Sequence, residues 1–242
     1  NYPLGYILLG NMYLKGDGVQ KNVIKAVDFY AKAANLNSQK AMLILAHLYR
    51  DGVQVQKNED LYLQWLQKAV SLNNLEAITE LASLYRTGEG VEKNPQKSLE
   101  LIQKGMAAKY PGAYYEMGVQ LEEGLMAKPD PVEALTWYEK AAKENYGPAA
   151  YRLAMAYFNG IGTQKDEQKA LTWLKAAVKT NDPQALFFMG SVYAKGLMKI
   201  KVNSSEALSF YQKAAELNYP PAMYEVGFAY YSGIGVMKNA KL

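Results

Sequence analysis

The amino-acid sequence predicts an all-α protein, a right-handed superhelical solenoid of antiparallel helix pairs with about 36 residues per repeat. Three observations support this fold class. An aromatic residue followed three positions later by glycine recurs along the chain, and the glycines lie 36 residues apart five times and then 37 apart. A small residue stands three positions before each aromatic position. The second half of each unit repeats a bulky residue followed four positions later by a small one, which is helical spacing.

The first helix of each unit, helix A, is predicted to end at the recurring glycine. In the second unit it covers about residues 41–49, and Gly52 just beyond it suits the left-handed conformation of a C′ residue. The small position of helix A lets a neighbouring helix approach closely. Its seven members are Gly10, Ala46, Ala82, Gly118, Ala154, Gly190 and Gly227.

The second helix, helix B, is predicted to begin after a residue whose short polar side chain accepts a hydrogen bond from the first turn. These N-cap residues are Asn22, Asn58, Asn94, Asp130, Asp166 and Asn203. The bulky position of helix B is expected to fill the space between the helices. It holds Phe29, Trp65, Leu101, Trp137, Trp173 and Phe210. If Trp137 is buried there, a Trp137→Ala substitution costs about 3–5 kcal/mol.

These residues resemble a known family, the Sel-1-like repeats, which are relatives of the tetratricopeptide repeat. The resemblance is clearest over residues 149–178, at Ala149, Tyr151, Leu153, Ala154, Tyr157, Gly160, Gly162, Lys165, Ala170, Trp173 and Ala177. It covers residues 1–242 as a single solenoid domain of six full repeats plus a seventh helix A. Departures are local, such as Leu121 in place of a helix A aromatic and one residue inserted between Gly196 and Asn203.

Both ends of the chain fall inside the repeat pattern. Residues 1–4 align with residues 218–221, and residues 238–242 stop where a seventh helix B would begin. A solenoid normally ends in polar caps. We therefore expect a fragment or trimmed form of a longer repeat protein, whose flanks carry any targeting signal. If the source is bacterial, the resemblance favours a periplasmic or secreted protein.

The composition excludes several functional classes. Half of the 242 residues are apolar, 21% are charged and the formal net charge is +4, which is typical of a folded chain. No stretch approaches the roughly 18 apolar residues of a membrane helix. Cysteine is absent and His47 is the one histidine, so thiolate chemistry and zinc–cysteine sites are excluded. We expect no catalytic residue, no metal, no cofactor, no small-molecule substrate and no membrane insertion.

Three features that suggest chemistry have simpler interpretations. The Gly-x-Gly loops lack the strand and third glycine of a dinucleotide site, so they are interpreted as turns. His47 has no nucleophile in register and is interpreted as facing solvent or a partner. Adjacent carboxylates such as Glu122 and Glu123 point about 100° apart on a helix, so they do not converge on one bond. They are interpreted as caps or solvated faces.

One surface is predicted to bind a partner. The most variable positions of helix A lie within about 60° on a helical wheel, and in tetratricopeptide-like relatives helix A lines the concave groove. The resemblance therefore places the partner-binding residues on the concave face, at His47, Glu80, Glu116, Val119, Arg152, Met155, Asn159, Phe188, Lys195 and Phe228. Replacing Arg152 or Phe188 by alanine is expected to weaken binding by about 1–3 kcal/mol and to change stability little.

The leading functional hypothesis is a non-enzymatic scaffold or adaptor that holds a partner protein or peptide in this groove. The resemblance implies adaptors of this kind, and a narrower alternative is an inhibitor or immunity protein that blocks a toxic enzyme. RNA binding is disfavoured because a phosphate-binding groove would be basic, whereas Glu80 and Glu116 make its middle acidic. A cell-wall or β-lactam hydrolase is disfavoured because one isolated histidine supplies no activated nucleophile.

Overall fold

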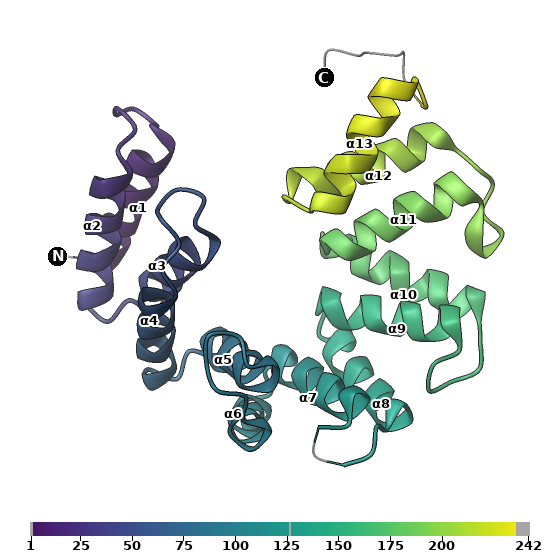
Figure 1. Cartoon of the computed structure of the whole chain (residues 1–242), viewed down its shortest axis with the longest axis horizontal. Helices are drawn as coiled ribbons and strands as arrows, with labels where there is room; N and C mark the ends of the chain where they lie inside the picture. The colour runs from purple at the N-terminus through teal and green to yellow at the C-terminus, as the bar shows by residue number, and fades with distance from the viewer. Residues whose placement is uncertain (1, 126, 236–242) are drawn as a thin grey trace. The chain divides into compact units, whose positions relative to one another are not determined.

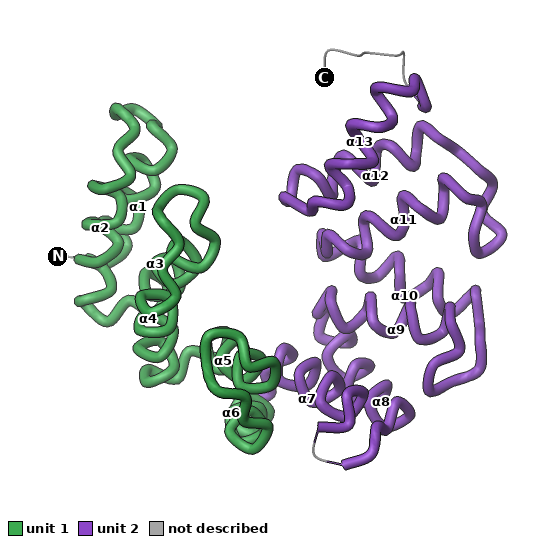
Figure 2. The backbone as a smooth tube through the Cα atoms, in the orientation of Figure 1, with its two compact units in different colours: residues 1–108 green, residues 109–242 purple. Residues whose placement is uncertain are grey.

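The protein is entirely helical in the part of the chain described by the computed structural model, residues 2–125 and 127–235 (Figure 1). These ranges contain thirteen α-helices of 13 residues each and one short 3-10 helix, and they contain no strand. The predicted all-α fold of repeated helix pairs is therefore confirmed. Internal contacts group the chain into two compact units, residues 1–108 and 109–242 (Figure 2).

Each unit is a stack of helix pairs in which a helix packs mainly on its neighbours in the chain. Unit 1 contains α1 (Pro3–Lys15), α2 (Val23–Asn35), α3 (Gln39–Asp51), α4 (Glu59–Ser71), α5 (Leu75–Thr87) and α6 (Pro95–Ala107). Unit 2 contains α7 (Pro111–Glu123), α8 (Pro131–Lys143), α9 (Gly147–Asn159), α10 (Glu167–Lys179), α11 (Pro183–Lys195), the 3-10 helix η1 (Leu197–Lys199), α12 (Ser204–Glu216) and α13 (Pro220–Ser232). None of the described helices is long and apolar enough to cross a membrane.

The predicted helix ends are confirmed. All six expected N-cap side chains accept a hydrogen bond from a backbone N–H of the first turn. The glycine after every helix A is left-handed, as at Gly52 with φ 67°. A loop hydrogen bond also recurs, in which the N-cap N–H of helix B donates to the carbonyl at the helix A aromatic position, for example Asn58 to Tyr49 at 2.9 Å. This bond ties the two helices of a pair together at the loop.

The residue inserted in the sixth repeat is absorbed without loss of this connection. The loop forms η1, and Met198 and Lys199 both take a positive φ there. Met198 is buried in the core of unit 2, while the Asn203 N–H still donates to the Tyr193 carbonyl at 3.0 Å. The helix pair therefore keeps the geometry of the others.

The core corrects one prediction. The bulky helix B position is only partly buried at five of its six members, Trp137 included, whereas the next residue along the helix is buried in every repeat. That buried position holds Tyr30, Leu66, Ile102, Tyr138, Leu174 and Tyr211. The two positions differ by about 100° around the helix, so one enters the core and the other lies at its edge. Trp137 instead stacks on Tyr114 at 6.0 Å between ring centroids and is covered by the Lys140 ammonium at 3.8 Å.

The small position of helix A matches the size of this buried helix B residue. Where the small residue is glycine, at Gly10, Gly118 and Gly190, the partner is tyrosine, and a Cβ on the glycine would lie 2.4–2.6 Å from the ring. Where it is alanine, at Ala46, Ala82 and Ala154, the partner is Leu66, Ile102 or Leu174. Each helix pair therefore has its own complementary contact.

Candidate functional site

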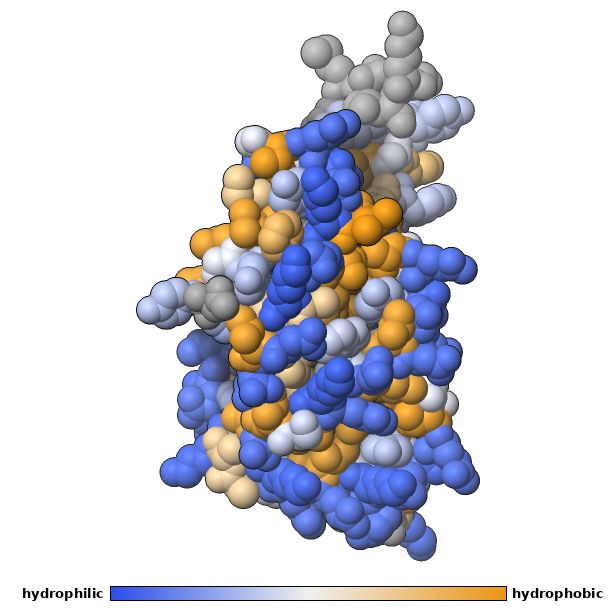
Figure 3. Space-filling model, turned by 90° about the vertical axis from the view of Figure 1, so that its left-hand side faces the viewer, coloured by the Kyte–Doolittle hydropathy of each residue, from blue (hydrophilic) through white to orange (hydrophobic). Residues whose placement is uncertain are grey.

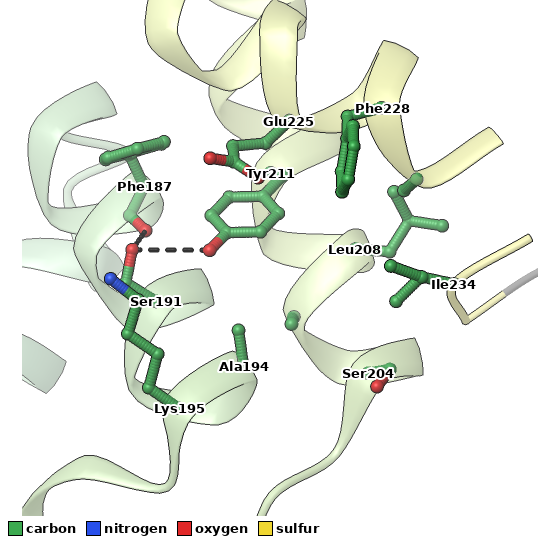
Figure 4. Close-up of a pocket in the computed structure, with 12 residues that line it drawn as sticks. Phe187, Ser191, Ala194, Lys195, Ser204, Leu208, Tyr211, Glu225, Phe228 and Ile234 are labelled. Atoms are coloured by element: carbon green, nitrogen blue, oxygen red, sulfur yellow. Dashed lines mark hydrogen bonds between the residues drawn. The ribbon is translucent and has the colours of Figure 1, made fainter. Parts of the chain in front are cut away.

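A pocket of about 340 Å³ lies in unit 2 among α11, α12 and α13 (Figure 4). We call it the α11–α13 pocket. Apolar side chains form most of its wall, including Leu208, Phe228 and Ile234. Polar residues also line it, namely Glu225, Lys195, Ser204 and Ser191, whose hydroxyl lies 3.3 Å from the Tyr211 hydroxyl.

The same pocket recurs at equivalent positions of other repeats. One of about 280 Å³ lies among α7, α8 and α9, and one of about 370 Å³ lies in unit 1 among α3, α4 and α5. Each is formed by two successive A helices and the helix B between them. The helix A position after the small residue shows the equivalence, because it lines the three pockets as Ser83, Met155 and Phe228. The repeat therefore builds one pocket whose walls vary.

Two positions of helix A decide what stands inside this pocket. One lies four residues after the small residue in one repeat, and the other lies two residues before it in the next repeat. We call them the register pair. Its members are Arg50 and Glu80 in the α3–α5 pocket, Glu122 and Arg152 in the α7–α9 pocket, Phe158 and Phe188 between α9 and α11, and Ala194 and Glu225 in the α11–α13 pocket.

The register pair of unit 1 is a hydrogen-bonded ion pair centred on Glu80. Arg50 Nη1 donates to Glu80 Oε1 at 2.7 Å, and the Tyr62 hydroxyl donates to the same oxygen at 2.9 Å. His47 Nε2 lies 2.9 Å from Glu80 Oε2. Burial alone would raise the pKa of Glu80, but the hydrogen bonds of His47 and Tyr62 and the charge of Arg50 outweigh it and lower that pKa. Burial and the adjacent Glu80 charge raise the pKa of Tyr62.

The register pair of the α7–α9 pocket also combines an arginine with a glutamate, but here the glutamate comes first in the chain. Arg152 Nη1 lies 3.6 Å from Glu122 Oε2, which also accepts a hydrogen bond from the Tyr138 hydroxyl at 2.7 Å. Burial, together with this hydrogen bond, raises the pKa of Tyr138. The pair joins helix A of the fourth repeat to helix A of the fifth.

Between α9 and α11 both members of the register pair are aromatic. Phe158 and Phe188 meet edge to face with ring centroids 5.5 Å apart, and Phe188 also contacts Tyr151 at 6.3 Å. Both phenylalanines pack against the core of unit 2. Large complementary rings therefore occupy this position, where the neighbouring repeats keep a pocket.

The structure distributes the ten predicted partner-binding residues among several environments. Arg152, Asn159, Lys195 and Phe228 are exposed, and Met155 lines the α7–α9 pocket. His47 and Glu80 are partly buried and bind each other. The remaining three were expected to face solvent. That expectation is wrong for Glu116 and Val119, which are 8% and 2% exposed, and Phe188 is partly buried because it packs on Phe158. The partner-binding role of these ten residues stays a prediction.

Helix B also contributes to the pockets, which was not predicted from the repeat pattern. The fourth residue after each N-cap lines all three, as Tyr62, Ala134 and Ala207. A signal was available, since this position is small in five repeats and tyrosine in one. Small residues there leave open space, and Tyr62 uses that space to reach Glu80.

The loop glycines are explained by turns, and His47 is explained by its contact with Glu80. Gly16 and Gly18 both take left-handed conformations, which confirms the interpretation of the Gly-x-Gly loops as turns.

Within residues 2–125 and 127–235, no group of three or more acidic, histidine or cysteine side chains is placed to hold a metal ion. Figure 3 shows one face of the molecule, on which hydrophilic side chains interrupt the apolar ones.

Comparison with known proteins agrees with this architecture. The family model described as Sel1 repeat matches seven successive segments, residues 3–38, 39–74, 75–108, 111–146, 147–181, 183–219 and 220–242. Comparison with curated proteins gives no match.

Solved structures with this fold come from several bacteria. The chain is 31% identical to a Sel1 repeat protein from Oxalobacter formigenes, with a TM-score of 0.70 over 90% of this chain and 89% of that one. It is 25% identical to a protective antigen of uropathogenic Escherichia coli, with a TM-score of 0.56 over 98% of this chain and 58% of the antigen. An immunity protein from Pseudomonas aeruginosa is 22% identical, with a TM-score of 0.65 over 89% of this chain and 82% of that protein. The chain belongs to the Sel1 repeat family.

Proposed function

We propose that this protein is a non-enzymatic scaffold that binds a protein or peptide partner by accepting its side chains in the pockets between repeats. Sel1 repeats typically mediate protein–protein interactions. The observation that supports the proposal is the recurrence of one pocket with different walls. It is mostly apolar at α11–α13 and contains an ion pair at α7–α9 and at α3–α5, whereas two phenylalanines stand at the register pair between α9 and α11.

The energetics of binding favour such a surface. A few anchoring side chains inserted into preformed pockets supply most of the free energy of a protein interface. The pockets are lined by helices that the core already holds in place, so little conformational entropy is lost when a partner binds. Varying the wall residues then changes partner preference while the buried positions keep the repeat folded.

Residues that suggest catalysis are accounted for by folding contacts. His47 binds Glu80, and the same carboxylate accepts hydrogen bonds from Arg50 and Tyr62. These side chains come from α3, α4 and α5, so the cluster joins three helices of unit 1. This role supports the non-enzymatic proposal.

Peptide selection against the full chain tests the proposal. We expect a displayed library of random peptides to yield binders whose affinity, measured by calorimetry, falls at least about ten-fold when the α11–α13 pocket is filled. The filling variant is Ala194→Phe with Glu225→Phe, which places the Phe158–Phe188 register pair in this pocket. Ala207→Tyr is a second filling variant, because Tyr62 stands at that position in unit 1.

The matched control is Glu216→Phe, which makes the same glutamate-to-phenylalanine change at an exposed position at the end of α12. Circular dichroism melting establishes that each variant is folded. If folded filling variants bind every selected peptide as well as the wild type does, or if selection yields no binder, the pocket-based scaffold is wrong. The immunity proteins from Pseudomonas aeruginosa share the fold at 22% and 21% identity, and inhibition of an enzyme by this chain remains the alternative hypothesis.

A further inference from the structure

Glu225 in the α11–α13 pocket occupies the position that Glu80 has in the α3–α5 pocket. Each glutamate stands two residues before the small position of its helix A. In unit 1 three side chains satisfy the Glu80 carboxylate, those of Arg50, Tyr62 and His47. The equivalent positions around Glu225 can therefore be compared one by one.

All three of these partners are replaced by small residues around Glu225. Ala194 stands in the place of Arg50, Ala207 in the place of Tyr62, and Ser191 in the place of His47. The Ser191 hydroxyl is used elsewhere, by the Phe187 carbonyl and the Tyr211 hydroxyl. Over the described residues 2–125 and 127–235, no hydrogen bond or ion pair reaches the Glu225 carboxylate. Lys195 lines the same pocket, but among the described residues it forms no ion pair with Glu225.

The walls suit a cation with an apolar stem. Figure 4 shows Glu225 between Phe187 and Phe228, with its carboxylate above the Tyr211 ring. Leu208 of α12 and Ile234 of the loop after α13 also line the pocket. A carboxylate among aromatic faces attracts a planar guanidinium, which accepts stacking on the rings and donates two parallel hydrogen bonds to the carboxylate.

We propose that the α11–α13 pocket binds an arginine side chain of a partner, with its guanidinium at Glu225 in the place that Arg50 takes against Glu80. This inference rests on the proposed function and names the partner group that one pocket accepts. The aliphatic part of the arginine packs on Leu208 and Phe228. The chain itself uses this solution at two other register pairs, Arg50–Glu80 and Arg152–Glu122. In the α11–α13 pocket the arginine comes from the partner.

A small probe tests this inference directly on the full chain. The probe is Nα-acetyl-arginine N-methylamide, titrated at low salt into 15N-labelled protein and followed by NMR. We expect saturable shifts at the amides of Ala194, Ala207 and Ala229. The citrulline analogue has the same shape but no charge, and we expect it to bind at least about ten-fold more weakly because it lacks the charge-assisted hydrogen bonds.

Two variants of the pocket and one control complete the test. Glu225→Gln is expected to weaken probe binding at least about ten-fold, whereas Glu216→Gln, an exposed control on α12, leaves it unchanged. Ala194→Arg gives this pocket an internal arginine–glutamate register pair like Arg50–Glu80. It is expected to abolish probe binding without lowering the melting temperature. The inference is overturned if the probe gives no saturable shift at these amides, if citrulline binds equally well, or if Glu225→Gln has no effect.

The two proposals fail in different ways. If selected peptides bind and the filling variant blocks them, but the arginine probe does not bind, only the arginine inference is wrong. If the probe binds at Glu225 and no peptide is selected, the pocket is a cation site and the scaffold proposal is wrong.

Discussion

At the scale of single residues, the connection from helix B to the next helix A depends on a left-handed residue that the sequence analysis did not single out. This residue has φ between 55° and 61° in all six connections. Its members are Asn37, Asn73, Lys109, Asn145, Asn181 and Asn218. Asparagine tolerates this conformation better than other residues that carry a Cβ, because its short side chain hydrogen-bonds locally. Lys109 is therefore the exception among the six.

Replacing Lys109 by asparagine is expected to stabilise the protein by about 0.5–1 kcal/mol, because the strain of a left-handed lysine is relieved. The measurement is the free energy of unfolding in urea. The reverse change, Asn145→Lys, is expected to destabilise by a similar amount. Equal stability of Lys109→Asn and the wild type would show that this backbone conformation carries no cost.

A second prediction at the residue scale concerns pH and Glu80. The folded-state pKa of Glu80 is lowered, so the ionised carboxylate stabilises the fold above its unfolded-state pKa, which is near 4.5. At neutral pH we expect Glu80→Gln to cost about 1–2 kcal/mol, because three helices lose a charged acceptor. As the pH falls from about 5 through the lowered pKa, wild-type Glu80 takes up a proton and this difference shrinks.

Urea unfolding of both proteins at pH 7, 5 and 3 measures this difference. Glu76→Gln is the control, because Glu76 is exposed on the same helix, α5. A constant difference between wild type and Glu80→Gln over the whole range would contradict the electrostatic role of this carboxylate.

At the scale of helices, the match between the small position and the buried helix B residue predicts a coupled pair. Gly118→Ala would gain about 1 kcal/mol from helix propensity alone, yet we expect a net loss of about 1–3 kcal/mol because the new Cβ meets the Tyr138 ring. Tyr138→Leu makes room for that Cβ. The double variant should therefore lose less free energy of unfolding than the two single variants lose together.

A double-mutant cycle measures this coupling in the free energy of unfolding. The comparison is Ala154→Gly, in a pair that already combines alanine with Leu174, where only a loss is expected. Additive effects at Gly118 and Tyr138 would mean that α7 and α8 move apart freely to accept the extra carbon.

Adjacent residues of one helix should also differ strongly in their contribution. In α10, Leu174 is fully buried and its neighbour Trp173 is only partly buried. We expect Leu174→Ala to cost about 2–5 kcal/mol and Trp173→Ala about 1–2 kcal/mol, although tryptophan is the larger side chain. Thermal and urea unfolding compare them. A larger loss for Trp173→Ala would place the core on the bulky position after all.

At the scale of the whole molecule, each helix contacts mainly its neighbours in the chain, and the contacts group into two units. Stability in such a protein is close to a sum over repeats and their interfaces. We expect Leu66→Ala, in the core of unit 1, to speed hydrogen exchange in α3, α4 and α5 and to leave α9, α10 and α11 unchanged. Mass spectrometry of exchanged peptides measures this. Uniform acceleration across both units would indicate global cooperativity.

Features that repeat along the chain were predictable. The 36-residue spacing of Gly52 and its equivalents, the N-cap side chains such as Asn58, and the interpretation of the Gly-x-Gly loops as turns were all inferred correctly. Each depends on local chemistry within a few residues, where a left-handed conformation favours glycine or where a side chain caps its own helix. Repetition makes such signals visible above chance.

The features that tertiary structure determines involve side chains from different repeats. Whether Trp137 or Tyr138 enters the core depends on the rotation of α8 against α7, which differs by about 100° between the two alternatives. Glu80 meets Arg50 across 30 residues of chain, and that contact exists only because successive A helices stack. Glu80 and Glu225 have the same position in their repeats and both line a pocket. Three side chains bind the Glu80 carboxylate, whereas the small residues Ala194, Ala207 and Ser191 stand at the equivalent positions around Glu225, and only the stacking of the helices brings these positions together.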